Sequence, residues 1–456
     1  MRLFKLFASL AAIAALTACV PATTADVSKS TTGDRITDLG QPVASGFGSG
    51  PAIGALRGNA EMAADFLDLN FRMESGRALP YLTRFEGPIT VALTGAVPPV
   101  ARSELARLIS RFRAEAGIDI RQTSGAASIT IDFQPKSKLR RAVPTAACFV
   151  VPNVTGLADY TRARNSAAVD WARLQRRERV AIMAPADSSP QEVRDCLHEE
   201  LAQAMGPLND LFRLPDSVFN DDNFHAVLTG FDMLMLRVHY APELRSGMNE
   251  AEVAAQLPAI LARLNPRGQG IGGSPKQLSP RSWISATQAA YGARSTTPAA
   301  AERMVSIAKA QGWSDTRMAF SLFARGRALT GKDIPAAVEA YAQAARIWRS
   351  QPGAAIHGAH ADMQLAAFAL SSGQFDTVLS LTDRAVPLAR SHQNASLLAS
   401  LLAMRAEAMD ALGRSEEARA ARLDSLGWAR YAFGSDAQVR ARMADIAMLA
   451  RRGARG

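Results

Sequence analysis

Residues 196–210 have the sequence CLHEELAQAMGPLND, in which polar residues stand at fixed intervals on an otherwise apolar helix. Side chains four positions apart share one face of a helix, so Glu199 and Gln203 lie on the same side, one turn apart. Gly206 ends the helix, and a chain that bends there can bring Asn209 back towards that face. Three polar side chains are therefore expected to converge on one site.

This spacing resembles the active-site helix of the metzincin zinc peptidases. In that helix two metal ligands stand at i and i+4, a Glu beside the first ligand is the general base, and a Gly lets a third ligand reach the same metal. Anchored on Gly206, the resemblance gives Glu199 and Gln203 the two helical ligand positions. It gives Glu200 the position of the base and Asn209 that of the third ligand.

The resemblance continues beyond the helix. Ser217-Val-Phe-Asn220 stands where metzincins of the matrixin type have a Ser-x-Met turn, with Phe219 in place of Met. Leu228-Thr-Gly-Phe-Asp232 and His239-Tyr240 are similar to the start and the end of their closing helix. Several features in the same order imply a zincin-like fold for this region.

The resemblance in fold is not expected to extend to zinc binding and zinc-dependent catalysis. All three ligand positions lack His, and neutral carboxamides such as Gln203 and Asn209 are poor zinc ligands. A register that starts from the pair His198-Glu199 places Ala202 at the second ligand position and fails. Because His225 and His239 could still approach in three dimensions, zinc remains the alternative to an expected absence of any metal or cofactor.

The polar residues of the motif are therefore interpreted as a buried network, inherited from an enzyme, that holds the helix and the following loop together. Its expected members are Glu199, Glu200, Gln203, Asn209 and Asp210. Glu200 is the only residue whose catalytic identity still matches, so it is the candidate catalytic residue.

The start of the chain has the pattern of a bacterial lipoprotein signal. Arg2 and Lys5 precede an apolar run from Leu6 to Leu16, which is too short to span a bilayer. The following Thr-Ala-Cys19 resembles a lipobox, whose Cys carries the lipid; a signal peptide with an incidental Cys is the alternative. Val20, which is not Asp, favours the outer membrane by analogy with known lipoproteins. Residues 1–19 are thus expected to be the signal and 20–57 a flexible tether rich in Thr, Ser, Gly and Pro.

The two other cysteines, Cys148 and Cys196, form an even pair. In an oxidising periplasm such a pair predicts a disulfide, with two free thiols as the alternative. The bond would tie the segment around residue 148 to the start of the motif helix.

The charge of the chain favours an anionic partner. The net charge is +10, and removal of the signal leaves 50 basic against 42 acidic residues, or +8. Nucleic acid is not expected as a partner, because a secreted lipoprotein rarely meets it and aromatic residues make up only 6% of the chain. Anionic lipid or a cell-wall polymer is the more sensible partner for that charge.

The segment 58–250 is expected to be an α+β region with a mixed sheet and the motif helix, the order found in zincins. Helices are expected at 59–71, at 103–116 and from Ser189-Pro190 to Gly206. Short β-branched or alternating runs predict strands at 89–93, 118–120, 128–133, 147–151 and 179–183.

Residues 251–280 are expected to be a helix followed by a Gly/Pro/Ser linker. Residues 281–456 are rich in Ala and Arg and are expected to be all helical. Gly331, Gly373 and Gly413 follow apolar helices at spacings of 42 and 40 residues. This period resembles tetratricopeptide-type helical repeats, with a plain helical bundle as the alternative. His357 and His360 are expected to be solvated or to pack between repeats.

Long matches across residues 59–248 are similar to the family called domain of unknown function 2927. They include Asp65-Phe-Leu-Asp-Leu with Glu74-Ser-Gly, Tyr81-Leu-Thr-Arg-Phe-Glu-Gly-Pro, Arg113-Ala-Glu-Ala-Gly-Ile-Asp-Ile and the stretch from Cys196 to Met248. The resemblance implies a bacterial secreted or lipoprotein context and no established activity.

Three functions remain. The favoured one is a catalytically silent zincin-like region joined to a helical scaffold that is anchored through Cys19, faces the periplasm and binds an envelope protein or peptide. The second is a peptidase-like hydrolase that uses Glu200 with an absent or non-standard metal. The third is a cell-wall or anionic-lipid binder. The oligomeric state does not follow from the sequence.

Overall fold

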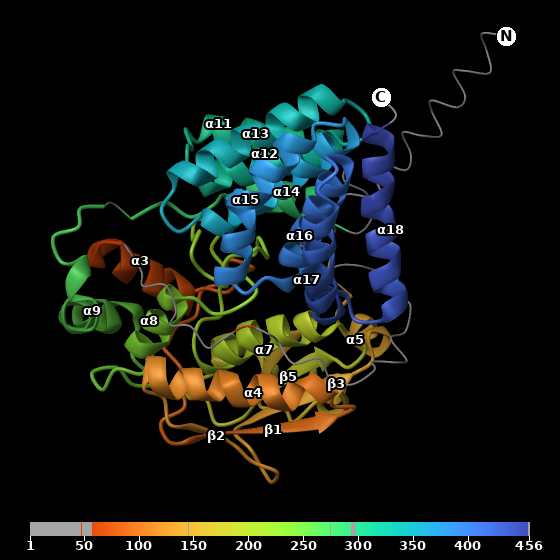
Figure 1. Ribbon diagram of the computed structural model, residues 1–456. Helices are drawn as coiled ribbons and strands as arrows, with labels where there is room; N and C mark the ends of the chain where they lie inside the picture. Colours follow the sequence, from red (N-terminus) through yellow and green to blue (C-terminus); the bar gives the residue numbers. More distant parts are fainter. Residues whose placement is uncertain (1–46, 48–56, 145, 274, 293–297, 455–456) are drawn as a thin grey trace.

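The computed structural model describes residues 47, 57–144, 146–273, 275–292 and 298–454. The predicted signal, Cys19 and most of the predicted tether lie outside the described residues. The chain forms an N-terminal α/β region with a five-stranded mixed sheet, followed by an all-helical region (Figure 1). The predicted fold class is therefore confirmed.

All five predicted strands are present, in the sheet order β2-β1-β3-β5-β4. Strands β2, β1, β3 and β5 run parallel, with Val91 opposite Ile129 and Ile131 opposite Ile182 in the two central pairs. Strand β4 is the antiparallel edge. The bounds are β1 Ile89–Gly95, β2 Ile120–Gln122, β3 Ile129–Gln134, β4 Phe149–Pro152 and β5 Val180–Pro185.

The two faces of the sheet are buried by different helices. Because alternate residues of a strand point to opposite faces, Ile182 of β5 joins the main core while Met183 joins a smaller cluster. The main core contains residues of α4 Pro99–Arg111 and α7 Pro190–Met205, and the smaller cluster contains residues of α5 Lys136–Ala142 and α6 Leu157–Ala163. Helix α7 is thus fixed on one face of the sheet.

Helix α4 differs from its prediction at both ends. It starts at Pro99, earlier than residue 103, because proline is favoured in the first turn of a helix. The last predicted turn is a π-helical segment, Phe112–Ala116, which ends at Gly117 with a φ of 68°. The chain leaves this turn before pairing with β1, so β2 begins two residues later than predicted, at Ile120.

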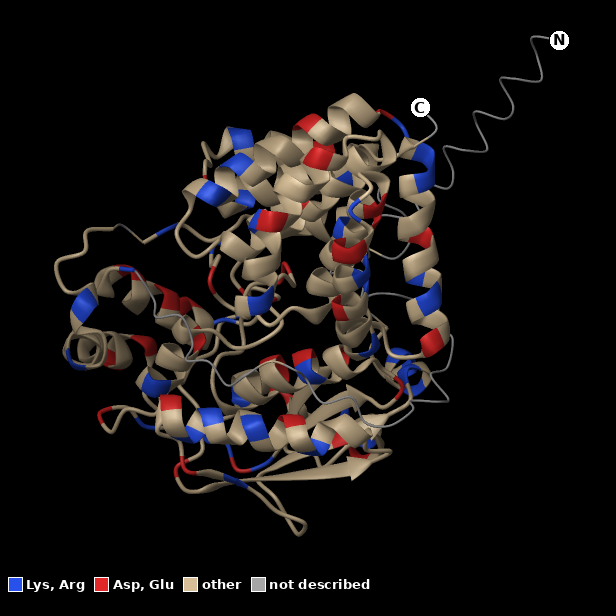
Figure 2. Cartoon of the chain, in the orientation of Figure 1, with Lys and Arg blue, Asp and Glu red and all other residues tan. Residues whose placement is uncertain are grey.

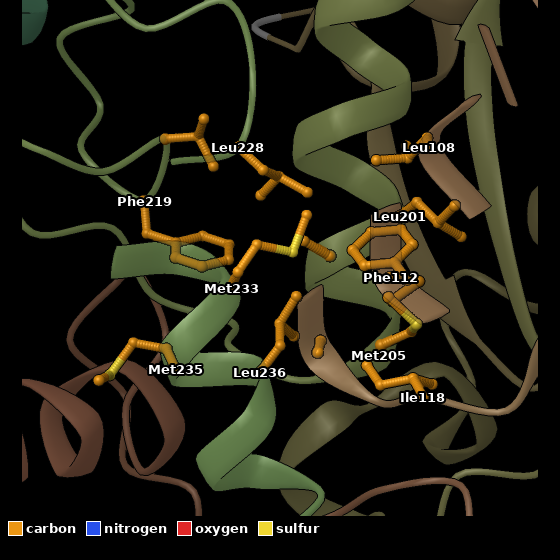
Figure 3. Close-up of a cluster of buried hydrophobic side chains, with 14 of the residues drawn as sticks. Leu108, Phe112, Ile118, Leu201, Met205, Phe219, Leu228, Met233, Met235 and Leu236 are labelled. Carbon is orange, nitrogen blue, oxygen red and sulfur yellow. The ribbon is translucent and has the colours of Figure 1, made fainter. Parts of the chain in front are cut away.

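Three more helices complete the N-terminal region: α3 Asn59–Asn70, α8 Gly230–His239 and α9 Glu250–Leu264. Helix α9 packs against α3 and α8, and Leu257 and Ile260 are fully buried in the same core as the sheet. Figure 3 shows this core around α7, where Leu201 and Met205 face Phe112.

The helical region consists of nine helices in the described residues. These are α10 Arg281–Tyr291, α11 Pro298–Ala310, α12 Thr316–Leu329, α13 Ile334–Ser350, α14 Ala355–Ser371, α15 Phe375–Ser391, α16 Ala395–Ala411, α17 Ser415–Phe433 and α18 Asp436–Gly453. Gly331, Gly373 and Gly413 lie in the turns α12/α13, α14/α15 and α16/α17, with φ values of 79°, 73° and 75°. Such turns favour glycine, which explains the period seen in the sequence.

Each of the two regions contributes side chains to the hydrophobic core of the other. Phe212 and Phe224, from the segment between α7 and α8, belong to the core of the helical region. Conversely, Ala395 and Tyr431 of the helical region belong to the main core of the N-terminal region. We call this contact zone, formed by residues 206–229 and α7 on one side and α13–α17 on the other, the joint. None of the helices in the described residues has the length and apolarity that a bilayer span requires.

Candidate functional site

Helix α7 carries the predicted motif and has well-defined ends. Ser189 caps its start by accepting a hydrogen bond from the backbone N–H of Glu192, whose side chain accepts one in return from Ser189 N–H at 2.8 Å. Pro190 occupies the first turn, and Gly206 ends the helix as predicted. The polar residues of the motif are thus held on a rigid element that lies on the sheet.

Arg177 binds the other end of α7. Its Nη1 atom donates to the carbonyl oxygens of Gln203 and Ala204, both at 2.7 Å, and its Nη2 atom donates to the carbonyl of Gly206. Its Nε atom donates to Thr83 Oγ1 at 3.1 Å. The side chain is buried, which lowers the pKa of Arg177 to about 10. A cation at the C-terminal end also complements the helix dipole. The sequence did not single out Arg177, because one Arg among several at 176–179 carries no pattern.

Carboxyl groups of the motif form an acidic cluster together with Glu74 and Asp221. Burial, together with the negative charges of Glu74 and Asp221, raises the pKa of Glu199 to about 8. Burial and the charge of Glu199 raise the pKa of Glu200 well above its ordinary value. Burial and the charge of Glu74 do the same for Asp210. These shifts favour the protonated form of all three groups.

The predicted polar network forms only in part. Gln203 Nε2 donates to Asp210 Oδ2 at 3.5 Å, so these two residues meet. Within the described residues, the buried Glu200 Oε2 has no hydrogen-bond partner. Such buried, unpaired carboxyl oxygens are costly unless the group is protonated, in agreement with the direction of the pKa shifts.

Asn209 is bound elsewhere. Its Nδ2 atom donates to the backbone carbonyl of Asp68 at 2.9 Å, on helix α3. The carboxylate of Asp68 in turn accepts from Arg213 Nη2 at 2.7 Å, and Arg213 also binds Asp65 at 2.7 Å. The third position of the motif therefore ties the segment after α7 to α3.

Each histidine near the motif has a ring nitrogen within hydrogen-bond distance of a backbone group. His198 Nδ1 accepts from the backbone N–H of Leu228 at 3.1 Å, and His239 Nε2 lies 3.3 Å from the carbonyl of Thr83. Burial lowers the pKa of both rings well below the ordinary value. His225 lies at the joint, 3.0 Å from the carbonyl of Pro215. His225 and His239 thus lie in different surroundings.

The turn with Phe219 is a buried, capped structure. Ser217 Oγ donates to Asp232 Oδ1 at 2.5 Å, and Asp232 also caps α8 with Thr229. Phe219 is fully buried and points towards Met233 in Figure 3. It fills with an apolar side chain the place that the resemblance assigns to Met.

The donor set does not fit a catalytic zinc ion. No imidazole belongs to the cluster, and the Asn209 side chain is turned towards α3, where its Nδ2 atom donates to the carbonyl of Asp68. Across the part of the chain that the structure describes, no three His, Cys, Asp or Glu side chains are arranged to hold a metal ion.

Cys148 and Cys196 form the predicted disulfide, with an S–S distance of 2.09 Å and a sequence separation of 48. The bond links the segment before β4 to the second turn of α7. It therefore fixes α7 covalently to the edge of the sheet.

No curated protein matches the chain. Residues 59–259 match the model of a family described as "Protein of unknown function (DUF2927)". The match begins with α3, includes the sheet, α7, the acidic cluster and α8, and ends within α9. Residues 59–259, less than half of the chain, are therefore similar to the DUF2927 family of proteins of unknown function.

Proposed function

We propose that this protein is a lipid-anchored protein of the bacterial envelope in which a zincin-like region without zinc chemistry and a helical region act together as one partner-binding body. Two features support the zincin-like fold: the strand order of the sheet, with β4 as its antiparallel edge, and the position of α7 directly after β5 in the chain. The lipobox-like sequence that ends at Cys19 supports the anchor.

The observation that carries this proposal is the use of residues 206–229. In a metzincin this segment would contribute the third ligand and the turn beneath the metal. Here it contributes Phe212 and Phe224 to the core of the helical region, and Asn209 to the contact with α3. A segment with these structural tasks joins two regions, and the carboxamides at Gln203 and Asn209 supply no imidazole for zinc.

Metal analysis tests the silent site. The full chain is expected to retain far less than one zinc per molecule after dialysis. The wild type and Glu200→Gln are both expected to show no peptidase activity above background. One zinc per chain that survives dialysis, together with a hydrolytic activity abolished by Glu200→Gln, would overturn this part of the proposal.

The anchor is tested separately. Because only a Cys can accept the lipid through its thiolate, Cys19→Ser is expected to abolish labelling by radioactive palmitate and to move the protein from the membrane fraction to the soluble fraction. Membrane attachment that persists in Cys19→Ser would contradict a lipid anchor.

A groove between α10 and α11 is the surface that we assign to the partner. It has a volume of about 480 Å³ and is lined by Ser282, Ser285, Arg303 and four alanines. Small side chains leave room for an extended peptide, and Arg303 suits a peptide carboxylate. The exposed Ala289 lines this groove, whereas the neighbouring exposed Gln288 does not belong to its lining.

The groove can be tested by filling it. Ala289→Trp is expected to remove a cross-linked envelope partner that the wild-type protein captures in cells, whereas Gln288→Trp, on the same helix, is expected to retain it. Equal capture by both variants would place the partner elsewhere.

The acidic cluster favours one second candidate, an acid–base hydrolase. A carboxyl group such as Glu199, with a pKa of about 8, can donate a proton at neutral pH. Adjacent helical residues point about 100° apart, however, so Glu199 and Glu200 would not normally share a substrate atom. This candidate requires turnover of a peptide or glycan substrate that Glu199→Gln abolishes.

A cell-wall or lipid binder driven by charge is less favoured. Figure 2 shows acidic and basic residues interspersed along the helices of both regions. A binder of this kind would be retained on peptidoglycan or anionic vesicles at low salt and released at high salt.

A further inference from the structure

Four of the six histidines of the chain meet at the joint. His225 comes from the segment after α7, His357 and His360 from α14, and His392 from the end of α15. The ring centroid of His225 lies 5.6 Å from that of His357 and 5.5 Å from that of His392. The ring of Phe224 lies 4.8 Å from His357 and 4.7 Å from His360. The two histidines of α14 are thus buried against the other region, not only between helices of their own.

One carboxylate faces this four-histidine cluster directly. Asp222, which is 3% exposed, accepts a hydrogen bond from His357 Nε2 at 2.8 Å. His225 Nε2 lies 3.0 Å from the carbonyl of Pro215, and His360 Nε2 lies 3.4 Å from the amide nitrogen of Asn394. One proton on the cluster can therefore be balanced by Asp222, and a second proton has no free counter-charge.

Asp195 of α7 favours its protonated form, because burial raises its pKa to about 8. Other charged groups on the surrounding elements are engaged in ion pairs or hydrogen bonds. Asp216 binds Arg57. Asp362 of α14 binds Arg349 of α13 and Arg384 of α15. Arg390 of α15 binds Asp424 of α17, and Arg194 of α7 donates to the carbonyl of Gln393. These groups leave the cluster with more potential positive charge than negative charge.

The surroundings favour the neutral form of His225, His360 and His392. Burial, together with the neighbouring imidazoles, lowers the pKa of His360 and of His392 to about 3. Burial and His357 also lower the pKa of His225. In an opened joint the same rings would be exposed to water, and their pKa values would return towards the ordinary value near 6.5.

We propose that the four-histidine cluster is a proton-sensitive lock, which holds the two regions together at neutral pH and opens the joint when the surroundings become acidic. Protons from solvent bind the free ring nitrogens in the open form, and no covalent bond changes. Opening would uncover Phe224 and the side of α7 that faces the helical region. This inference does not depend on the proposed function.

The direction follows from proton linkage. A ring whose pKa is lower in the closed joint than in the open joint favours closure above pH 6.5 and loses that preference as the pH falls. Each of His225, His360 and His392 can shift the ratio of open to closed molecules up to about tenfold per pH unit below 6.5. Together His360 and His392 give up to about a hundredfold between pH 7.5 and 5.5.

Hydrogen exchange of the full chain, corrected for the intrinsic pH dependence of exchange, tests the lock. Between pH 7.5 and 5.5, peptides from residues 206–229 and from α14 are expected to lose protection at least tenfold, while β3 and β5 retain theirs. The double variant His225→Gln/His392→Gln is expected to keep the joint protected at pH 5.5. His239→Gln, a buried histidine outside the joint, is the matched control and is expected to open like the wild type.

Two results would overturn the proposal. One is a simultaneous loss of protection in the joint and in the sheet, which would indicate general acid unfolding. The other is a double variant that opens at the same pH as the wild type. If the double variant does not fold, the half-buried His392 can be changed alone, and His392→Gln must move the opening to lower pH.

Discussion

Asp222 of the segment after α7 and His357 of α14 form a buried hydrogen bond of 2.8 Å across the joint. The other oxygen of Asp222 accepts from the backbone N–H of Phe224 at 3.1 Å, which orients the aromatic ring at the centre of the cluster. One carboxylate therefore both positions Phe224 and binds the opposite region.

Asp222→Ala is expected to lower the free energy of unfolding by about 2–3 kcal/mol, because a buried imidazole loses its charged acceptor. Urea denaturation at pH 7.5 measures the change. Glu178→Ala, at a side chain that is 73% exposed, is the control and should change stability by less than about 0.5 kcal/mol. A loss for Asp222→Ala as small as that of the control would mean that the bond contributes little.

Arg177→Met should destabilise the N-terminal region by at least about 3 kcal/mol, since it leaves three buried carbonyl oxygens at the end of α7 without their donor. Arg177→Lys should recover only part of this loss, because one ammonium group cannot reproduce the planar fork. Urea denaturation followed by far-UV circular dichroism gives both values. The exposed Arg179→Met is the matched control, and an equal effect there would refute the capping role.

Glu199→Gln should stabilise the protein at alkaline pH. The pKa of Glu199 is about 8 in the folded chain and 4.5 as the ordinary value, so the folded state binds more protons between these values and its stability falls as the pH rises through that window. The glutamine variant lacks this loss, and its advantage over the wild type should grow to about 1–3 kcal/mol at pH 8.5, allowing for partial solvent screening.

Urea midpoints at pH 6.5 and 8.5 measure that advantage, and the contribution of the histidines cancels because the wild type and the variant carry the same ones. Glu178→Gln serves as the exposed control. An advantage of Glu199→Gln that is the same at both pH values would show that the carboxyl does not titrate in this window.

Removal of the disulfide by Cys148→Ala/Cys196→Ala should cost about 4 kcal/mol, because a closed loop of this length restricts the unfolded chain. Thermal unfolding with and without reductant measures the effect. The wild type should lose thermal stability in reductant and the double variant should not respond. A wild type that is insensitive under conditions that demonstrably reduce the bond would contradict this estimate.

Much of the fold could be predicted because its signals are local. The Ser189-Pro190 start and the Gly206 end of α7 depend on backbone geometry within one turn, and the strands depend on short β-branched runs. The glycine period of the helical region depends on positive φ angles in tight turns. The disulfide followed from having only two cysteines after the predicted lipid site. The start of α4 was predicted less well, because its proline signal lay outside the periodic apolar run.

The candidate site was predictable only as a set of residues. The sequence indicated that Gln203 and Asp210 belong to one polar site, and these two do meet. It could not show that Asn209 binds α3 instead, or that Glu74 raises the pKa of Asp210. These interactions join residues more than a hundred positions apart, and no spacing along the chain encodes which charges become neighbours after burial.

The sequence by itself determined the α7 motif, the mixed sheet, the all-helical second region and the cysteine pairing, since each depends on periodicity, turn chemistry or counting. Only the tertiary structure decided that Arg177 closes α7, that the segment after α7 enters the core of the helical region, and that four histidines gather around Phe224. The physical reason is that burial and long-range packing set these partners and their protonation, and both arise only when distant segments of the chain come together.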